Sequence, residues 1–432
     1  MAPRLPQRPG PGANVVVRGA RVLDPAAGID EVRDLVIRDG VVGGDPDGLE
    51  VIDAGGMIAV PGFVDPHVHL RTPGREDLED IATGSLAAAA GGFVTIVAMP
   101  NTSPVVDSAA ILGTLLDRAG EEAVVRVGFL AAITVGQKGA ELTEQAELAE
   151  LGAVGFSDDG HPVADARVMR RALQYQRITG LPLVLHEEDP KLSGKGVMHE
   201  GAVASRLGLE GIPSISESVA VARDAALAEY EDGWIHICHV SAVETAEEIR
   251  RAKARGVRIT GEVTPHHLTL TDEAVHSLDP ARHKMNPPLR EESDRQALIA
   301  ALAEGTLDCV ATDHAPHDAD EKEVPFEEAP FGITGLETAF AVCNTHLVRT
   351  GALPLETLVR RMGADAAEVL GLPAPTLADG AVADLALIDP DAEVTVGEGG
   401  FRSKSRNSAW TGETLHGRVA LTIAGGQIAW RP

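Results

Sequence analysis

Residues 62–74, GFVDPHVHLRTPG, place two histidines and an arginine directly after an apolar β-strand pattern. His67 and His69 are two positions apart, so on a strand both imidazoles point to the same side. Arg71 follows two positions later. The pattern has two interpretations: an ordinary polar loop, or one corner of a metal site that handles an anionic substrate. Two histidines at this spacing are a common chance pattern, so the rest of the chain has to decide.

The same combination of an apolar strand and polar residues at its end recurs through the middle of the chain. The predicted strands alternate with helix-like segments such as residues 76–92, 165–180 and 242–256. This alternation predicts a parallel sheet covered on both faces, and eight units predict a (β/α)8 TIM-like barrel of the α/β class. A doubly wound open sheet is the alternative that periodicity alone leaves open. The predicted strands are residues 62–70, 94–102, 125–134, 152–160, 182–189, 234–241, 258–268 and 309–317.

Nearly every predicted strand ends in a residue with useful chemistry. In a barrel the carboxyl ends of the strands meet at one mouth, where active sites lie, whereas in an open sheet they spread along an edge. Convergence explains the pattern better, and we therefore expect the barrel. The strand-end residues are His67, His69, Asn101, Asp159, His186, His239, His266, His267 and Asp313.

The strand-end histidines suggest a metal site. His186 and His239 each are more commonly hydrogen-bonded histidines when taken alone, but they occupy the same relative position on successive strands. With His67 and His69 they offer four imidazoles, and imidazoles combined with carboxylates suit zinc. Asp313 could ligate the metal, take a proton from its bound water and protonate a leaving group, or it could be a helix N-cap.

Other polar residues near the strand ends are harder to place. Asp158 and Asp159 precede Gly160, so either one could bridge two metals or simply form a turn, and strand alternation does not choose between them. His317 has room on its loop to face a substrate. His314 has no clear position, and His236 should face away from the metal site on its strand.

Both ends of the chain have a different, β-rich pattern. Residues 14–24 and 34–44 each predict strand, turn and strand, with Asp39-Gly40 at the second turn, and Gly425-Gly426 predicts a further hairpin. We expect the two ends to pack together as a small β-sandwich domain. The expected division is a disordered tail over 1–13, the sandwich domain over 14–60 and 375–432, and the metal-dependent barrel over 61–374.

Composition limits the possible partners. The formal net charge of −28 repels nucleic acid and anionic membranes, so neither is an expected partner. An anionic small-molecule substrate then needs a local cation, and Arg71 is the candidate. The three cysteines lack CxxC spacing, which suits the reducing cytoplasm, and we find no signal-peptide pattern and no apolar run long enough to span a membrane.

Seven motifs, in chain order, resemble the amidohydrolase superfamily and more specifically the bacterial type I dihydroorotases. The resemblance covers essentially the whole chain after the tail. It implies two zinc ions, one held by His67, His69 and Asp313 and one by His186 and His239, with Asp159 as the bridge. Residues 152–160 contain no lysine, which counts against the hydantoinase-like branch, where a carboxylated lysine is expected. The motifs are GFVDPHVHLRTPG, MPNTSP, FSDDG, LHEED, HVS, EVTPHHL and ATDHAPH.

The resemblance also implies the substrate contacts. Arg71 and Asn101 would bind a substrate carboxylate, and a guanidinium fork suits that group. The alternative for Arg71 is a surface ion pair with Glu76 or Asp77. The long irregular stretch 316–333 could close over the mouth as a lid. The implied substrate-binding residues are His69, Arg71, Asn101, Asn286, His317, Phe331 and Gly332.

The implied reaction is the reversible, zinc-dependent hydrolysis of (S)-dihydroorotate to N-carbamoyl-L-aspartate in de novo pyrimidine (UMP) synthesis, with Asp313 as the catalytic acid and base. Another cyclic amidohydrolase, such as an allantoinase or dihydropyrimidinase, is the nearer alternative. A non-catalytic partner of aspartate transcarbamoylase is the second, but such chains usually lose metal ligands and all expected ones are present here. A homodimer is expected, and association with aspartate transcarbamoylase is possible for a catalytic chain too.

Overall fold

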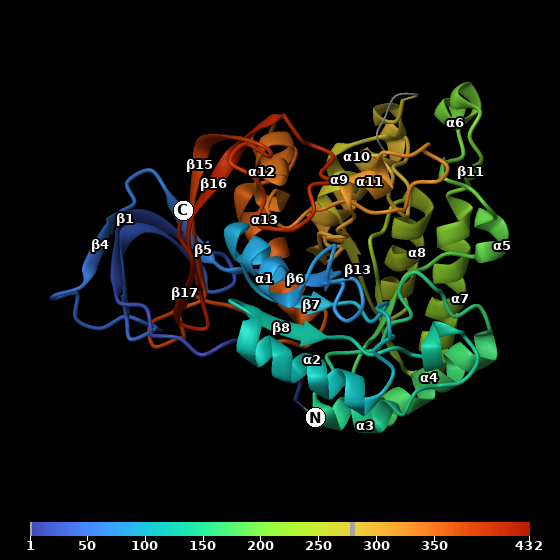
Figure 1. Ribbon diagram of the computed structural model, residues 1–432, viewed down its shortest axis with the longest axis horizontal. Coiled ribbons are helices and arrows are strands. Elements are labelled where there is room, and N and C mark those ends of the chain that lie inside the picture. Colours follow the sequence, from blue (N-terminus) through green and yellow to red (C-terminus); the bar gives the residue numbers. More distant parts are fainter. Residues whose placement is uncertain (1, 277–280) are drawn as a thin grey trace.

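The computed structural model describes residues 2–276 and 281–432. It shows a barrel with helices around it, and a β-rich domain beside the barrel that both ends of the chain build (Figure 1). The terminal strands, blue and red, lie together on one side of the molecule. This arrangement confirms the predicted TIM-like barrel with a β-sandwich domain from the chain ends.

The barrel has eight parallel positions in the predicted order. Seven are strands, and the fourth is the single residue Phe156, which pairs with Ala131 and Leu183 on its two neighbours. Val68 pairs with His314 and closes the ring, so the open-sheet alternative is wrong. The strands are β6 (Phe63–Val68), β7 (Phe93–Ala98), β8 (Arg126–Phe129), β9 (Leu183–Leu185), β12 (Trp234–Ile237), β13 (Arg258–Val263) and β14 (Cys309–Val310).

Helices follow the barrel strands and cover their outer faces (Figure 1). The longer helices are α1 (Ile81–Ala90), α2 (Ala109–Glu122), α3 (Gln145–Leu151), α4 (Ala166–Thr179), α7 (Ile215–Glu231), α8 (Val243–Ala254), α10 (Glu292–Glu304) and α13 (Leu355–Met362). The shorter elements are α5 (Pro190–Ser193), α6 (Ala202–Leu207), α9 (Pro265–Thr269), α11 (Ala319–Lys322), α12 (Ala339–Cys343), α14 (Ala364–Glu368), the 3-10 helices η1 (Val135–Gln137) and η2 (Asp272–Ala274), the π-helix η3 (Asn344–Val348), and the paired strands β10 (Met198–His199) and β11 (Gly211–Ile212). Among the described residues, no helix combines the length and apolar composition that crossing a bilayer requires.

The interior of the barrel is filled with side chains at its amino end. Val64, Val97 and Val184 from three strands form one buried cluster with Ala366 of α14 and with Leu370 just after it. A barrel of this size is a packed core and not a pore. The packing closes one end and leaves the carboxyl ends of the strands as the place for a site.

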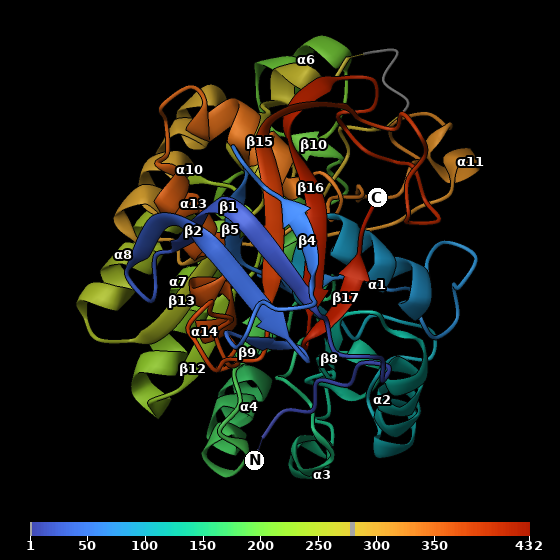
Figure 2. The same cartoon turned by 90° about the vertical axis from the view of Figure 1, so that its left-hand side faces the viewer.

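The strands of the terminal domain form one hydrogen-bonded sheet that folds over a shared core, so that its two halves pack as a sandwich (Figure 2). Its strand order is β17-β16-β15-β5-β1-β2-β3, and β4 pairs with β1. The pairing of β5 with β15 joins the two chain ends, and β6 begins two residues after β5 ends. The strands are β1 (Val15–Asp24), β2 (Ile29–Arg38), β3 (Val41–Val42), β4 (Glu50–Asp53), β5 (Ile58–Pro61), β15 (Leu385–Thr395), β16 (Thr414–Ala424) and β17 (Gln427–Trp430).

Two of the three turn predictions are confirmed. Asp39-Gly40 and Gly425-Gly426 have positive φ at both residues, as a two-residue hairpin turn of this kind requires. The third is wrong, because residues 14–24 do not form a strand, a turn and a strand. Instead β1 is one strand with a register shift between Val17 and Ala20, where Gly19 adopts a φ of +71° and forms a bulge.

The N-terminal segment is ordered over residues 4–13, so the prediction of a disordered tail is wrong there. The backbone of Arg4 donates to Gly152 and that of Arg8 to Ala123, each at 3.0 Å, and Gln7 donates from its side chain to two carbonyls. Prolines in this segment favour an extended backbone, and the extended chain can hydrogen-bond along the barrel. The boundaries drawn at residues 60/61 and 374/375 stay predictions.

Candidate active site

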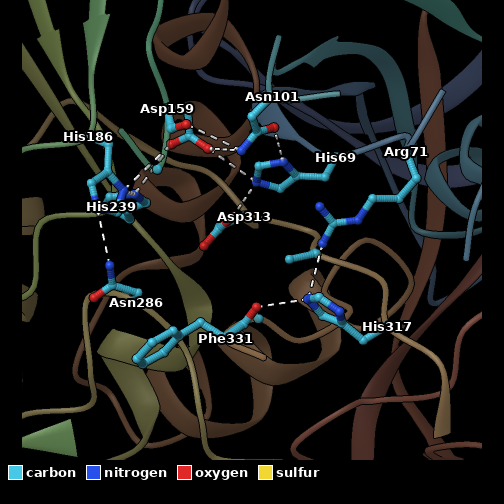
Figure 3. A pocket seen from close by; sticks show the side chains of 13 residues that line it. His69, Arg71, Asn101, Asp159, His186, His239, Asn286, Asp313, His317 and Phe331 are labelled. Atoms are coloured by element: carbon cyan, nitrogen blue, oxygen red, sulfur yellow. Dashed lines mark hydrogen bonds and ion pairs between the residues drawn. The ribbon is translucent and has the colours of Figure 1, made fainter. Parts of the chain in front are cut away.

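A cavity of about 230 Å³ lies at the carboxyl ends of the barrel strands (Figure 3). It brings together all the predicted site residues except His67, which lies just beneath it and is fully buried. The residues that line the cavity are His69, Arg71, Asn101, Asp159, Gly160, His186, His239, Asn286, Asp313, Ala315, His317, Phe331 and Gly332.

One group of potential ligands combines the first and last barrel strands. Asp313 Oδ1 lies 3.1 Å from His69 Nε2 and 3.5 Å from His67 Nε2. The ligand atoms of these three residues all lie within 4.8 Å of one another, close enough to contact one cation. The two imidazoles point the same way, as the spacing on β6 predicts.

A second group lies beside the first. His186 Nδ1 and His239 Nε2 are 2.9 Å apart, and Asp159 Oδ1 lies 3.6 Å from the former and 4.0 Å from the latter. Two imidazole lone pairs repel at this distance, so the contact needs a proton or a cation between them. Asp159 Oδ1 is also 3.7 Å from His67 Nε2, which puts one carboxylate oxygen between both groups. We call these six residues the ligand cluster: His67, His69, Asp159, His186, His239 and Asp313.

The geometry separates the two neighbouring aspartates that strand alternation could not. Asp158 accepts hydrogen bonds from the backbone N–H groups of Ile133 and Thr134, at 2.8 and 3.1 Å, and from the Thr134 hydroxyl. Its carboxylate is therefore occupied by the loop after β8. Asp159 instead faces the cavity and the histidines.

Hydrogen bonds behind the ligand cluster fix the direction of the imidazoles. His67 Nδ1 lies 2.7 Å from Glu262 Oε1, and His69 Nδ1 lies 3.0 Å from Asn101 Oδ1. Both acceptors require a proton on Nδ1, so Nε2 is the nitrogen of each imidazole that can face a metal. Asn101 also donates from Nδ2 to Asp159 Oδ2 at 2.8 Å, so its amide joins members of both ligand groups.

The charges of the ligand cluster favour a bound cation. Burial lowers the pKa of His67, but the negative charges of Glu262, Asp313 and Asp159 outweigh burial and raise it to about 10. Burial raises the pKa of Asp159, but His186, His67 and His69 outweigh that effect and hold the pKa well below its usual value. Within the described chain, His67 Nε2 and Asp159 Oδ1 are buried without a hydrogen-bond partner. A metal ion fits this set of donors.

Backbone strain is concentrated at the same place. Of the seven non-glycine residues with positive φ in the described ranges, three line the cavity: Arg71, His239 and Asp313. Such residues cost about 1–3 kcal/mol each and cluster at functional sites, where the surrounding structure maintains them. The strained residues lie directly after strands, where the chain turns its side chains into the mouth.

Loops form the opposite side of the cavity. Arg71 donates from Nε to the Pro316 carbonyl at 3.1 Å, and its Nη2 lies 3.2 Å from His317 Nε2. Its partners are therefore on the 316–333 loop and not Glu76 or Asp77, which were the alternative. Burial, followed by the charge of Arg71, lowers the pKa of His317 to about 3, so this imidazole is neutral. Together Arg71, Asn286, His317, Phe331 and Gly332 form what we call the loop wall.

Buried lysines hold the loop wall in place. Lys322 donates to the backbone carbonyls of Lys284, Pro330 and Gly332, at 3.3, 2.8 and 2.9 Å. Lys284 donates to the Phe326 carbonyl at 2.6 Å and lies 4.7 Å from the Phe331 ring centre. The N–H of Gly332 donates to Lys284 and its carbonyl accepts from Lys322, so both backbone groups already have partners in the protein.

Several histidines near the strand ends lie outside the cavity lining. His236 lies 3.0 Å from Glu262 on the barrel interior, in agreement with its placement away from the metal site. His314 accepts from the Gly335 backbone and lies 3.3 Å from Glu79, and His267 lies 3.0 Å from the Pro287 carbonyl. His266 is also fully buried. His314 and His267 thereby connect loops around the mouth.

Glu262 is the site residue that the sequence reasoning missed. It is a fully buried carboxylate in the buried second half of strand β13. A charged residue on a buried strand must have partners, and this rule was the available signal. Burial raises the pKa of Glu262, but the charge of His67 and the hydrogen bonds from His236 and His67 outweigh burial and lower the pKa to about 2.

Solved structures share the architecture of this chain. The dihydropyrimidinase from Brevibacillus agri NCHU1002 superposes with a TM-score of 0.83 over 97% of this chain and 95% of that chain, at 24% identity. The L-hydantoinase from Arthrobacter aurescens gives a TM-score of 0.84 over 96% of each chain, at 25% identity. These similarities show the fold, and the ligand cluster lies at the mouth of its barrel.

Sequence relatives show both the class and the family of the chain. The dihydroorotase of Anaeromyxobacter dehalogenans (strain 2CP-1) is 53% identical over 422 residues, 95% of this chain and 96% of the relative. That of Geobacter sp. (strain M21) is 49% identical over 424 residues, 97% of this chain and 99% of the relative. A family model described as dihydro-orotase-like matches residues 56–245. The chain is a metal-dependent cyclic amidohydrolase. Within this class it belongs to the dihydroorotase family.

Proposed function

We propose that this chain interconverts (S)-dihydroorotate and N-carbamoyl-L-aspartate, in the direction of ring closure during de novo pyrimidine synthesis. One observation supports this more than any other: the ligand cluster and the Arg71 guanidinium face the same cavity. A cyclic amide with a carboxylate needs both a site for amide hydrolysis and a fixed cation. The family of the chain favours the same substrate.

We propose that the ligand cluster holds two zinc ions. His67, His69 and Asp313 would hold one, His186 and His239 the other, and Asp159 Oδ1 lies between the two groups. Nitrogen and oxygen donors of this kind suit zinc. Bound there, the metal supplies a water of lowered pKa and a Lewis acid for the amide carbonyl.

Asp313 is the proposed general base and general acid. Its carboxylate lies between the histidines of the ligand cluster and the loop wall (Figure 3). In hydrolysis it takes the proton of the attacking water as the new C–O bond forms. It then gives this proton to the ring nitrogen as the C–N bond breaks. In ring closure the same carboxylate takes the proton from the carbamoyl nitrogen and gives it to the departing oxygen.

Arg71 is the proposed partner of the substrate carboxylate. Its guanidinium lines the cavity, and the backbone carbonyl of Pro316 together with His317 fixes its orientation. We propose that Asn101, Asn286, His317, Phe331 and Gly332 complete the substrate site, as in the resemblance. The amide of Asn101 already joins His69 to Asp159, so we assign it a positioning role in addition. Fixing the carboxylate orients the amide over the ligand cluster.

The wider setting rests on the family resemblance. We propose a cytoplasmic homodimer that acts on a small molecule and can associate with aspartate transcarbamoylase. Sedimentation of the purified chain, alone and mixed with that enzyme, tests both assemblies.

Metal analysis combined with a substrate panel tests the proposed function. We expect about two zinc ions per chain, loss of dihydroorotate turnover after chelation and recovery when zinc is added back. Dihydrouracil lacks the carboxylate, and a charged hydrogen bond contributes about 1.5–3 kcal/mol, so its kcat/KM should be about 10- to 100-fold lower. Equal turnover of dihydrouracil or allantoin would favour another cyclic amidohydrolase. No turnover by the zinc-loaded chain would favour a non-catalytic role.

A further inference from the structure

Glu262 contacts both groups of the ligand cluster without lining the cavity. Its Oε1 lies 2.7 Å from His67 Nδ1 and 3.1 Å from the backbone nitrogen of His239, and its Oε2 lies 3.0 Å from His236 Nε2. The carboxylate is fully buried. It therefore belongs to the layer of residues directly behind the proposed ligands.

The hydrogen bonds determine which nitrogen of each histidine carries a proton. An ionised carboxylate only accepts, so His67 must donate from Nδ1, and Nε2 is then the nitrogen that can bind a metal, facing Asp159 and Asp313 at 3.7 and 3.5 Å. By the same rule His236 donates from Nε2. Its Nδ1 then accepts from the Thr260 hydroxyl at 2.8 Å. Every polar contact of Glu262 is satisfied in one arrangement of protons.

The same carboxylate holds the backbone of His239. This residue has a φ of +33°, a conformation that a histidine adopts only when its surroundings maintain it. The hydrogen bond from its N–H to Glu262 provides such support. His239 Nε2 in turn faces His186 Nδ1, so Glu262 influences one ligand of each group.

We propose that Glu262 is a positioning residue that sets the tautomer of His67 and the backbone of His239, and so holds both ligand groups in the geometry that binds zinc. This inference rests on the proposed zinc site. His236 and Thr260 complete the network by directing Oε2 away from the ligands. Removing a partner of this kind lowers metal affinity about 10- to 100-fold in proteins generally.

Two variants separate the charge of Glu262 from its hydrogen bonds. In Glu262→Gln the amide oxygen can still accept from His67, while the amide NH2 faces His236, whose Nδ1 then donates to Thr260. In Glu262→Leu the acceptor is lost and three donors are left buried. We therefore expect zinc affinity to fall about 10-fold in the Gln variant and about 100-fold in the Leu variant.

Zinc affinity is measured by competition with a chromophoric chelator on the purified full chain. Once the variants are saturated with zinc, KM for dihydroorotate should stay within about 2-fold of the parent value, because Glu262 does not line the cavity. Asp24→Asn is the matched control. Asp24 is equally buried and accepts from Thr376 and Leu377 in the terminal domain, so its loss should lower the melting temperature but not zinc affinity.

The outcomes distinguish this inference from the proposed function. If the unchanged chain binds no zinc, the proposed site itself is wrong. If it binds zinc and the folded Gln variant binds equally well, Glu262 has no positioning role. If the Leu variant does not fold, the near-isosteric Gln variant decides. A parallel loss of zinc affinity in Asp24→Asn would show a general stability effect and would also overturn the inference.

Discussion

The two sides of the cavity are built by different means. The ligand cluster lies at the ends of buried parallel strands, and hydrogen bonds to Glu262 and Asn101 hold its imidazoles from behind. The loop wall comes from irregular segments, and buried lysines hold its backbone through carbonyl groups. We assign the chemistry of the reaction to the ligand cluster, which buried strands support. We assign recognition of the substrate to the loop wall, which irregular segments form.

This comparison predicts how substitutions on each side should act. A change in the ligand cluster should reduce kcat or metal affinity, because the reacting groups lie there. A change in the loop wall should raise KM and leave zinc in place. The three substitutions below test this separation, and each has a control variant. Two of the controls should leave kcat, KM and zinc content unchanged, and the third separates metal ligation from proton transfer.

The largest expected effect is that of Asp313→Ala. With the proton-transferring carboxylate removed, we expect kcat to fall about 10²- to 10⁴-fold, the range typical of general acid and base catalysis. Steady-state kinetics at saturating zinc measures it, because Asp313 is also a proposed ligand. Circular dichroism checks the fold. Asp313→Asn, which can still contact a metal through its oxygen, separates ligation from proton transfer. An unchanged kcat in a folded, zinc-loaded Ala variant would remove Asp313 from the mechanism.

Arg71→Met should have a smaller effect of a different kind. Loss of a charged hydrogen bond to the substrate carboxylate should raise KM about 10- to 100-fold, with zinc content unchanged. Initial rates over a range of dihydroorotate concentrations measure KM, and metal analysis measures zinc. Arg118→Met is the control, since Arg118 pairs with Glu122 and Glu76 away from the cavity. A normal KM in Arg71→Met would mean that another group binds the carboxylate.

The difference between the ligand cluster and the loop wall also explains which parts of the molecule the sequence could predict. Strand periodicity and the convergence of parallel strands are geometric rules, so the barrel, the order of its strands and the convergence of the histidines at its mouth follow from the residues alone. The loop wall obeys no such rule, and Asn286, Phe331 and Gly332 could be named only through the resemblance to dihydroorotases. Within a strand end the rules also fail to separate Asp158 from Asp159. Hydrogen bonds from a neighbouring loop make that choice.

Two further failures have physical causes. The proline- and glycine-rich start suggested disorder, but an extended backbone can pair along the barrel, and composition does not show whether a partner lies nearby. Glu262 lies within β13, so the rule that places site residues directly after strands does not single it out. A buried charge inside an apolar strand predicts a network of partners even when those partners are distant in sequence.

Lys322→Met should have the smallest effect of the three substitutions, and it tests the loop wall directly. The variant leaves the carbonyls of Lys284, Pro330 and Gly332 without their shared donor, and an unpaired buried group costs about 1–3 kcal/mol. The 316–333 loop should open more often, so we expect KM to rise about 10-fold and limited proteolysis within the loop to accelerate. Because no ligand moves, kcat at saturating substrate should change less than 2-fold. The exposed Lys195→Met is the control. A fall in kcat or zinc content with an unchanged KM would show that the loop supports the ligand cluster, and the separation between the two sides would then be wrong.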